Sequence, residues 1–189
     1  MAARGDLPFD RRDVEAWLRA RGTERIEHPG GTLHDHLRRV ATLLGDWGAG
    51  PLLEAAGLCH ACYGTDGYRR ALLDLGDRKT LAALIGGSAE ALVYLYGSCD
   101  RAVAYPQLAG AGAVRLRDRF TGKTHAPDEH DVRGFAELTA ANELDVLRHN
   151  EDLATSFGPE LFGLIASVRH RLSEAAWRAW VDFADSGRP

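Results

Sequence analysis

The sequence has little of what marks a secreted, membrane or nucleic-acid-binding protein. It contains only three cysteines in 189 residues, too few for a disulfide framework. Its apolar stretches are far shorter than a membrane span, and no apolar run of signal-peptide type follows the first residues. The net charge of −4 gives no general attraction to nucleic acid or to an anionic membrane. We therefore expect a cytoplasmic protein with no nucleic-acid and no membrane partner.

Several common catalytic motifs are missing as well. There is no Walker motif, no dinucleotide fingerprint and no nucleophile elbow. Cys59 and Cys62 have the spacing C-x-x-C, but no second pair is present to complete a structural zinc site. No histidine follows Cys62, which excludes covalent haem attachment. We interpret these cysteines as core residues rather than as a redox pair.

What the sequence does contain is helical periodicity. The length suits one domain with a buried core, here residues 1–189, and the composition of 45% apolar and 26% charged residues is typical of a globular protein. Apolar residues recur at helical spacing almost throughout. The predicted helices cover residues 8–22, 32–47, 51–64, 77–85, 88–96 and 128–150, and two more begin at Pro159 and Ser173.

One segment favours strand instead. Residues 114–117 alternate between apolar and polar, residues 120–123 have turn character, and Thr124 and His125 could return alongside the first segment. The prediction is an all-α domain with one small β-hairpin inserted between helices. The last helix, rich in tryptophan, is expected to pack over the bundle.

Polar residues interrupt three of the apolar helix faces. His36 lies within the apolar stripe of the second helix, and His60 lies on the apolar side of the third. Asn142 and Asp145 share one face of the long helix. Burying such side chains is costly unless they bind one another, water or a metal. We therefore predict that His36, His60 and Asn142 lie within one pocket.

These residues carry a resemblance to a known superfamily. The stretches Thr32–Val40 and Ala55–His60 resemble the start of an HD metallohydrolase domain, with a histidine on one helix and a second histidine 24 positions later, similar to the stringent-response alarmone hydrolases. Residues 141–145 resemble the later helix of that domain, so the similarity spans about residues 28–150. The block His28–Leu33 with His60–Thr65 also looks like a small family of HD-like proteins of unknown function. The resemblance implies an HD-like helical bundle and a metal site of His36, His60 and Asn142.

The sequence departs from the HD pattern at both aspartates. Ala61 stands where an aspartate should follow His60, and Asn142 stands where the late helix should carry the other. Because hard divalent ions need anionic oxygen ligands, we expect one divalent transition metal (Fe, Zn, Mn or Ni) to be bound weakly or not at all. His34, Asp35, Asp145 or a substrate oxygen could complete the ligand shell.

Three classes of function stay open on the sequence. The first is an HD-like enzyme acting on a small polar or anionic metabolite, as a hydrolase with a metal or as a lyase or isomerase by histidine chemistry without one. The second is a catalytically inactive HD-like ligand-binding or regulatory module. The third is an interaction protein that uses its last helix, and a homodimer fits any of the three. For the enzyme, the candidate catalytic residues are His60, Tyr63 and Asp145, and the candidate substrate-binding residues are Arg101, His34 and Thr65.

Overall fold

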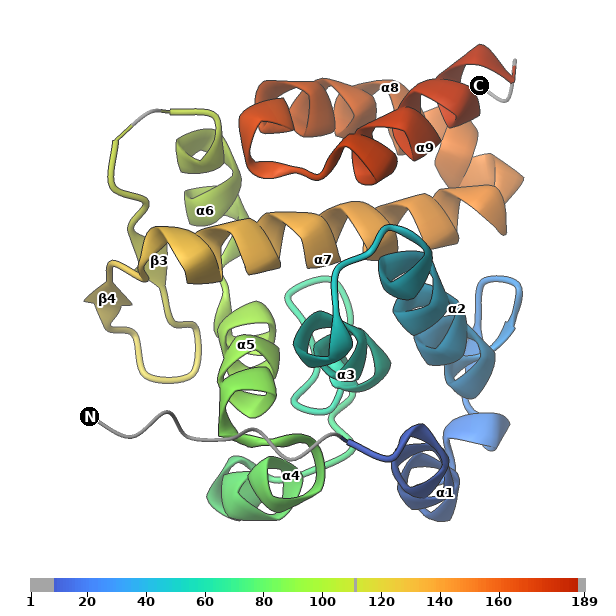
Figure 1. The fold of residues 1–189 in the computed structure, drawn as a ribbon, viewed down its shortest axis with the longest axis vertical. Helices are drawn as coiled ribbons and strands as arrows, with labels where there is room; N and C mark the ends of the chain where they lie inside the picture. The colour runs from blue at the N-terminus through green and yellow to red at the C-terminus, as the bar shows by residue number, and fades with distance from the viewer. Residues whose placement is uncertain (1–8, 111, 187–189) are drawn as a thin grey trace.

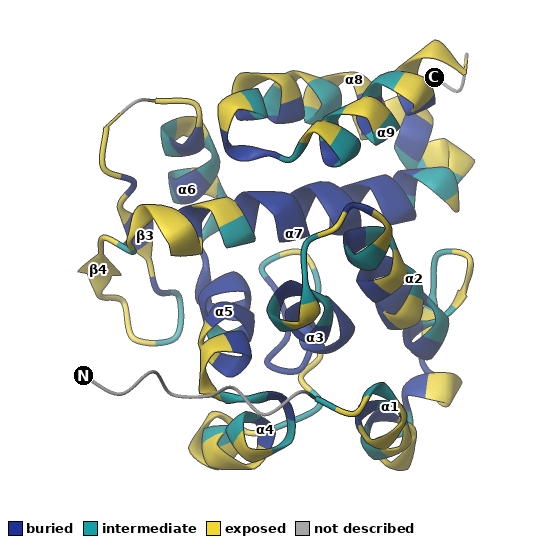
Figure 2. Ribbon diagram, in the orientation of Figure 1, coloured by how far each residue is buried: buried dark blue, intermediate teal, exposed yellow. Residues whose placement is uncertain are grey.

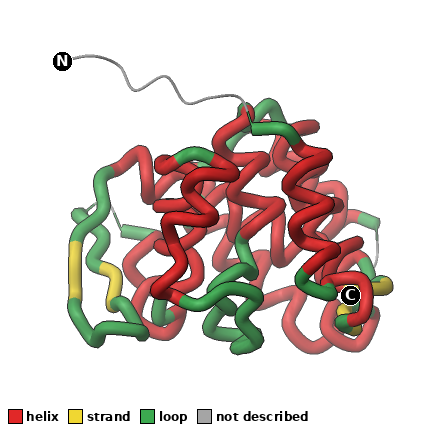
Figure 3. The backbone as a smooth tube through the Cα atoms, turned by 90° about the horizontal axis from the view of Figure 1, so that it is seen from below, coloured by secondary structure: helices red, strands yellow, loops and turns green. Residues whose placement is uncertain are grey.

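The computed structural model describes residues 9–110 and 112–186, and this part of the chain is all-α apart from two minimal β-ladders (Figure 1). Strand residues are confined to short segments at the edges of the helical body (Figure 3). None of the helices in these ranges is both long enough and apolar enough to span a membrane. The helices are α1 (Arg11–Ala20), α2 (Leu33–Asp46), α3 (Pro51–Cys59), α4 (Arg78–Ile85), α5 (Gly87–Ser98), α6 (Arg101–Leu108), α7 (Glu129–Arg148), α8 (Glu151–Ser167) and α9 (Glu174–Asp185).

Helix α7 is the central element of the fold. It crosses the molecule with α2, α3 and α5 on one side and α8 and α9 on the other (Figure 1), and most of its length is buried (Figure 2). Asp128 caps its first turn through a hydrogen bond from the Asp131 amide. The tryptophan-rich α9 packs over this helix as predicted, since Trp180 is fully buried and donates its indole N–H to the Ala140 carbonyl.

Helices α2 and α3 pack closely against each other. Thr32 and Asp35 form a capping box at the start of α2, and Pro51 occupies the first turn of α3, where its missing N–H costs nothing. Gly57 allows the two helices to approach, because a Cβ atom there would lie 2.5 Å from Leu44 Cδ1. This close approach brings the end of α3 beside the middle of α2.

Replacing Gly57 by alanine should therefore destabilise the protein although alanine is the better helix former. We expect Gly57→Ala to lower the free energy of unfolding by about 1–2 kcal/mol, because overpacking outweighs the gain in helix propensity. Gly163→Ala is the matched control, since no atom lies within 4 Å of the added Cβ in α8, and it should stabilise by about 0.5–1 kcal/mol. Urea unfolding of both variants measures this, and equal effects would contradict the packing argument.

Two antiparallel ladders interrupt the helices. The predicted hairpin is present but short, with β3 (Leu116–Arg117) paired to β4 (Thr124–His125). A second ladder, in a segment where the sequence predicted no strand, joins β1 (Glu27–His28) to β2 (Gly31–Thr32). The Pro29-Gly30 pair turns the chain there, and Gly30 has a φ of 77°, a conformation that glycine adopts readily.

Several predicted helix boundaries are wrong. The third helix ends at Cys59 rather than near Gly64. The helix predicted from Ser88 begins at Gly87. The helix predicted from Pro159 begins at Glu151, because Asn150 supplies the cap and Pro159 is tolerated inside α8 at the loss of one backbone hydrogen bond. The predicted start of the first helix at Pro8 lies outside the described residues, and α1 begins at Arg11, capped by Asp10.

Helix α6 was not predicted at all. The sequence predicted no helix between residues 96 and 128, whereas Asp100 caps one through a hydrogen bond from the Val103 amide. Arg101 is consequently the first residue of α6. This placement directs it toward the centre of the molecule, with only 24% of its side chain exposed.

Candidate functional site

A pocket of about 210 Å³ lies where α2 and α7 meet the end of α3 and the loop of the first ladder. Its wall contains His36, His60 and Asn142, as the sequence predicted, together with a third histidine, His28. The rest of the wall is mixed. It comprises Pro29, Leu33, Ala61, Thr65, Gly67, Tyr68, Arg101, Glu143, Val146 and Leu153.

His36 is held by an acidic residue on its far side. Its Nδ1 lies 2.7 Å from Asp145 Oδ2 in a buried pair, so Nδ1 carries the proton that is donated to the carboxylate. In the neutral ring Nε2 is then an unprotonated acceptor that faces the pocket. A carboxylate behind a histidine in this way is typical of histidines that bind metals.

Asp145 is ionised and firmly fixed. Burial raises its pKa, but hydrogen bonds from His36 and Arg39 outweigh that effect and leave the pKa below its usual value. Arg39 donates to both carboxylate oxygens, at 2.7 and 3.0 Å. The same guanidinium also donates to the Pro29 and Gly30 carbonyls. Arg39 therefore connects Asp145 to the loop that carries His28.

His60 is oriented by the end of its own helix. It is the C-cap residue of α3, where the last carbonyls have no partner within the helix, and its Nδ1 donates to the Gly57 carbonyl at 2.7 Å. Its Nε2 is therefore also an acceptor directed into the pocket. Burial first, and the neighbouring His36 second, lower the pKa of His60 to about 3, so the ring is neutral at physiological pH.

The pKa of His60 predicts how stability depends on pH in the presence of a chelator. The folded pKa of about 3 lies below the ordinary value of 6.5, so the unfolded chain takes up the proton first as the pH falls. The contribution of His60 is complete above about pH 6.5 and is lost toward pH 3, at up to about 1.4 kcal/mol per pH unit.

The same measurement on His60→Gln separates the contribution of His60 to the pH dependence of stability from those of the other histidines. Denaturant unfolding between about pH 7 and pH 4 should give a slope of stability against pH that is about one proton smaller in the variant. His28 titrates with the same sign, because burial and His36 lower its pKa to about 4, and it is retained in both proteins. Identical slopes would mean that His60 is not buried in its neutral form.

Three acceptor atoms converge in the pocket. His36 Nε2 lies 3.2 Å from His60 Nε2 and 3.1 Å from Asn142 Oδ1. The Asn142 amide is oriented by its Nδ2, which donates to Glu143 Oε1 at 3.1 Å, so its oxygen faces the histidines. When His36 Nε2 carries no proton, these three atoms are all acceptors, and their lone pairs repel one another unless a cation or an additional proton is shared among them.

The donor set fits a transition metal. Ligands that bind one ion at about 2.1 Å lie at most about 4.2 Å apart, and the observed separations of 3.2 and 3.1 Å satisfy this limit. Two imidazoles and an amide oxygen suit zinc, iron or nickel better than magnesium. His36 and His60 each have the outer hydrogen bond that keeps a ligating histidine in the correct tautomer.

His28 was not predicted as a site residue. Its ring stacks on His36 with centroids 4.0 Å apart and an interplanar angle of 25°, and Tyr68 lies edge-on to it at 6.0 Å. Its Nδ1 is buried and has no hydrogen-bond partner among the described residues. The only sequence signal was the His-Pro-Gly-Gly block, which resembled an HD-like family without indicating what His28 contacts.

The other predicted residues divide into two groups. Arg101 and Thr65 line the pocket, whereas His34 and Tyr63 do not. His34 is buried beside the short turn that follows α1, with its Nδ1 3.1 Å from Thr23 Oγ1. Tyr63 points to the opposite side of the turn after α3, where its hydroxyl donates to Glu90. Both side chains therefore make their hydrogen bonds outside the pocket. The sequence could not predict this, because helical spacing determines the face on which a residue lies but not which neighbour covers that face.

Asp145 and the cysteines Cys59 and Cys62 lie outside the pocket wall. Asp145 lies behind His36 rather than in the pocket wall, so its contact with the site is through the imidazole. Cys59 and Cys62 are fully buried core residues, as interpreted from the sequence. A hydrogen bond with Cys62 and burial together raise the pKa of the Cys59 thiol well above its usual value, which makes it a poor nucleophile.

Arg101 and Glu143 form an ion pair in the pocket wall. Arg101 NH1 donates to Glu143 Oε1 at 3.0 Å, and NH2 donates to the Tyr96 hydroxyl. Although burial opposes a charge here, the surrounding groups, with Tyr96 and Glu143 foremost, raise the pKa of Arg101. Glu143 lies within the HD-like segment 141–145 but was not predicted as a site residue, because its partner lies 42 positions away.

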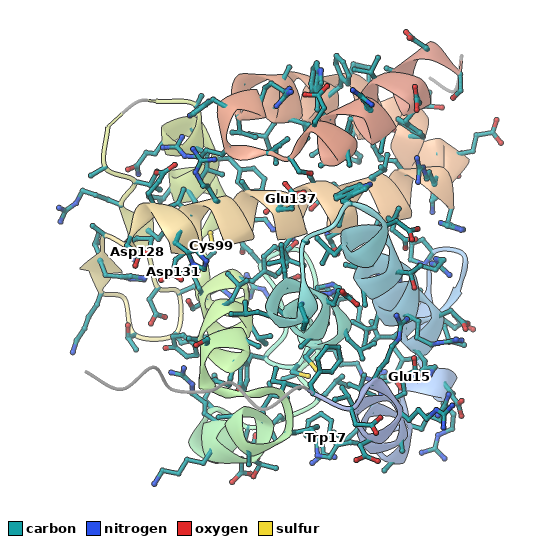
Figure 4. All side chains as sticks on the ribbon, in the orientation of Figure 1. Glu15, Trp17, Cys99, Asp128, Asp131 and Glu137 are labelled. Carbon is teal, nitrogen blue, oxygen red and sulfur yellow. The ribbon has the colours of Figure 1, made fainter. Side chains whose placement is uncertain are left out.

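A separate group of possible metal ligands lies on the surface, at the start of α7. The ligand atoms of Asp128, His130 and Asp131 lie within 4.8 Å of one another, and all three residues are exposed. Figure 4 shows the two aspartates at the N-terminal end of α7, away from α2 and α3. Asp128 already serves as the helix cap, so this cluster has an ordinary structural explanation.

Comparison with known protein families gives a match over the first part of the chain. Residues 17–101 match the model of a family described as a domain of unknown function (DUF6817). The matched segment covers less than half of the chain. It includes His28, His36 and His60 and ends before α7, which carries Asn142 and Asp145. The chain matches no curated protein and no solved structure.

Proposed function

We propose that this protein is an HD-like enzyme that acts on a small polar or anionic metabolite in the histidine pocket. One divalent transition metal would be held by His36, His60 and Asn142. The observation that carries the proposal is that His60 Nε2 and Asn142 Oδ1 lie 3.2 and 3.1 Å from His36 Nε2 in a buried site. Such an arrangement is unfavourable in a core that has only a packing role.

The metal would supply Lewis acidity and would lower the pKa of a water molecule toward neutrality, which makes hydrolysis the reaction class we favour. The residues of the chain have separate tasks. Asp145 and the Gly57 carbonyl fix the two imidazoles. Arg101 and Thr65 line the wall where substrate would bind, and Glu143 keeps the Asn142 oxygen directed at His36.

A ligand-binding module without catalysis is the second candidate, and the residue at position 61 favours it. Ala61 lies in the pocket wall where the resemblance implies an aspartate, and Asn142 replaces the other carboxylate. The His36–His60–Asn142 cluster therefore contains no anionic ligand of its own, as expected if metal chemistry has been lost while the pocket is retained.

Turnover by the metal-loaded protein distinguishes the two candidates. The chain is loaded with one equivalent of zinc, manganese or iron(II) and incubated with a library of small metabolites, and their consumption is followed by mass spectrometry. We expect at least one compound to be consumed by the wild type and not by His60→Gln. If the loaded wild type binds metal but consumes nothing that the variant leaves intact, the enzyme proposal is wrong and the binding module is favoured.

A further inference from the structure

Arg101 and Glu143 place opposite charges side by side in the wall of the histidine pocket. Their closest atoms, NH1 and Oε1, lie 3.0 Å apart, and the two side chains are 24% and 11% exposed. Both residues line the pocket that contains His36 and His60. The ion pair is thus accessible from the pocket, while most of it is shielded from bulk solvent.

Each partner retains capacity for further hydrogen bonds. Of the five N–H groups of Arg101, the described residues accept one from NH1 and one from NH2. Glu143 Oε1 accepts from both Arg101 and Asn142, whereas Oε2 accepts no hydrogen bond from the described residues. Arg–carboxylate pairs are frequently bidentate, whereas this one leaves a carboxylate oxygen and several guanidinium donors available.

Both groups are held in position before any ligand arrives. The Arg101 backbone N–H donates to Asp66 at 3.0 Å at the start of α6, and its guanidinium lies 5.7 and 5.8 Å from the rings of Tyr96 and Tyr105. Glu143 is carried by the buried central helix α7. A ligand therefore does not have to order these side chains on binding.

The adjacent charges disfavour any ligand that carries only a positive or only a negative charge. A simple anion that reaches Arg101 also approaches the Glu143 carboxylate, and a simple cation that reaches Glu143 also approaches Arg101. At an effective dielectric constant near 20 these repulsions offset much of the attraction. A ligand carrying both charges makes two favourable contacts at once.

We propose that the pocket binds a small zwitterion. Its anionic group would accept hydrogen bonds from the remaining donors of Arg101, and its ammonium group would donate to Glu143 Oε2. The volume of about 210 Å³ limits the ligand to about the size of a small amino acid. Leu33, Val146 and Leu153 offer an apolar wall for a short aliphatic side chain. The inference names the substrate class for the proposed function, although binding itself does not depend on catalysis.

Matched sets of ligands test this by isothermal titration calorimetry with a chelator present. The zwitterions are glycine, L-alanine, L-valine and L-leucine. Propionate and isovalerate lack the amine of alanine and valine, and ethylamine and isobutylamine lack the carboxylate. We expect at least one zwitterion to bind saturably and its single-charge analogues to bind about tenfold more weakly or worse, because each loses a charge-assisted hydrogen bond.

Variants test whether the ion pair is responsible. Glu143→Gln keeps the size of the side chain but removes its charge, and it should reduce the preference for the amino acid over its amine-free analogue to less than about threefold. Arg101→Lys keeps the charge without the guanidinium donors and should weaken zwitterion binding about tenfold. Arg133→Gln, a substitution at a 54%-exposed side chain on α7, should leave binding unchanged. Circular dichroism checks that each variant is folded.

Three results would overturn the proposal: no zwitterion binds, propionate or inorganic phosphate binds as tightly as every amino acid, or Glu143→Gln retains the full preference. A parallel zinc titration of the wild type distinguishes a failure of the zwitterion proposal from a failure of the proposed metal-dependent function. Loss of zwitterion binding with intact zinc binding rejects only the ligand class. Zwitterion binding without zinc binding rejects only the proposal that the pocket holds a metal.

Discussion

The double variant Ala61→Asp/Asn142→Asp is expected to bind zinc about 100-fold more tightly than the wild-type chain. Both positions lie in the pocket wall beside His36 and His60. Each substitution adds an anionic oxygen where the wild type offers a methyl group or a neutral amide. A full charge within about 4 Å of an ion is worth several kcal/mol at an effective dielectric constant near 20, and desolvation of the new carboxylates removes part of that gain.

Competition against a chromophoric chelator measures the two affinities. Ala61→Asn with Asn142 retained is the control, because it adds an oxygen ligand without adding charge and should change the affinity far less. The melting temperature of each protein with and without zinc verifies that it is folded. If the wild type already holds a full equivalent tightly and the double variant gains nothing, the absent aspartates do not limit metal binding and other ligands must be sought.

Removing the carboxylate behind His36 should have the largest effect on stability. We expect Asp145→Ala to lower the free energy of unfolding by about 3 kcal/mol, because it leaves His36 without its acceptor and the buried end of Arg39 without its counter-ion. The loop held by Arg39 loses part of its anchor as well. Urea unfolding of the metal-free protein measures the loss.

The Asp145 variant should also bind metal more weakly. Loss of an outer-shell carboxylate typically costs about 10–100-fold in affinity, and a defect confined to stability would not change the affinity of the folded fraction. Asp182→Ala, at an exposed position on α9, should change stability by no more than about 0.5 kcal/mol. An Asp145→Ala protein as stable as this control would show that the buried network contributes little.

The parts of the site that the sequence predicted are those governed by helix periodicity. His36, His60 and Asn142 each interrupt an apolar helix face, so their inward direction follows from spacing alone, and the structure brings them into one pocket. The helix starts at Thr32, Asp128 and Ser173 were also recognisable from local sequence, and the structure places an N-cap at each of these residues. These features depend on a few neighbouring residues of the chain.

The parts that were missed depend on contacts between distant segments. His28 joins the site only because its turn folds back over His36 and is held there by Arg39. Arg101 meets Glu143 across 42 positions, and α6, whose start directs Arg101 inward, was not predicted. His34 shows the converse, since its inward face is covered by Thr23 and not by the site.

The most direct test of the metal site is anomalous diffraction from crystals of the wild-type protein grown with zinc, measured at the zinc absorption edge. We predict one strong peak within about 2.3 Å of both His36 Nε2 and His60 Nε2, with Asn142 Oδ1 in the same coordination shell. A map with no peak between these two histidines, or with zinc only at the exposed Asp128, His130 and Asp131 cluster, would contradict the proposal that the converging acceptors form a metal site.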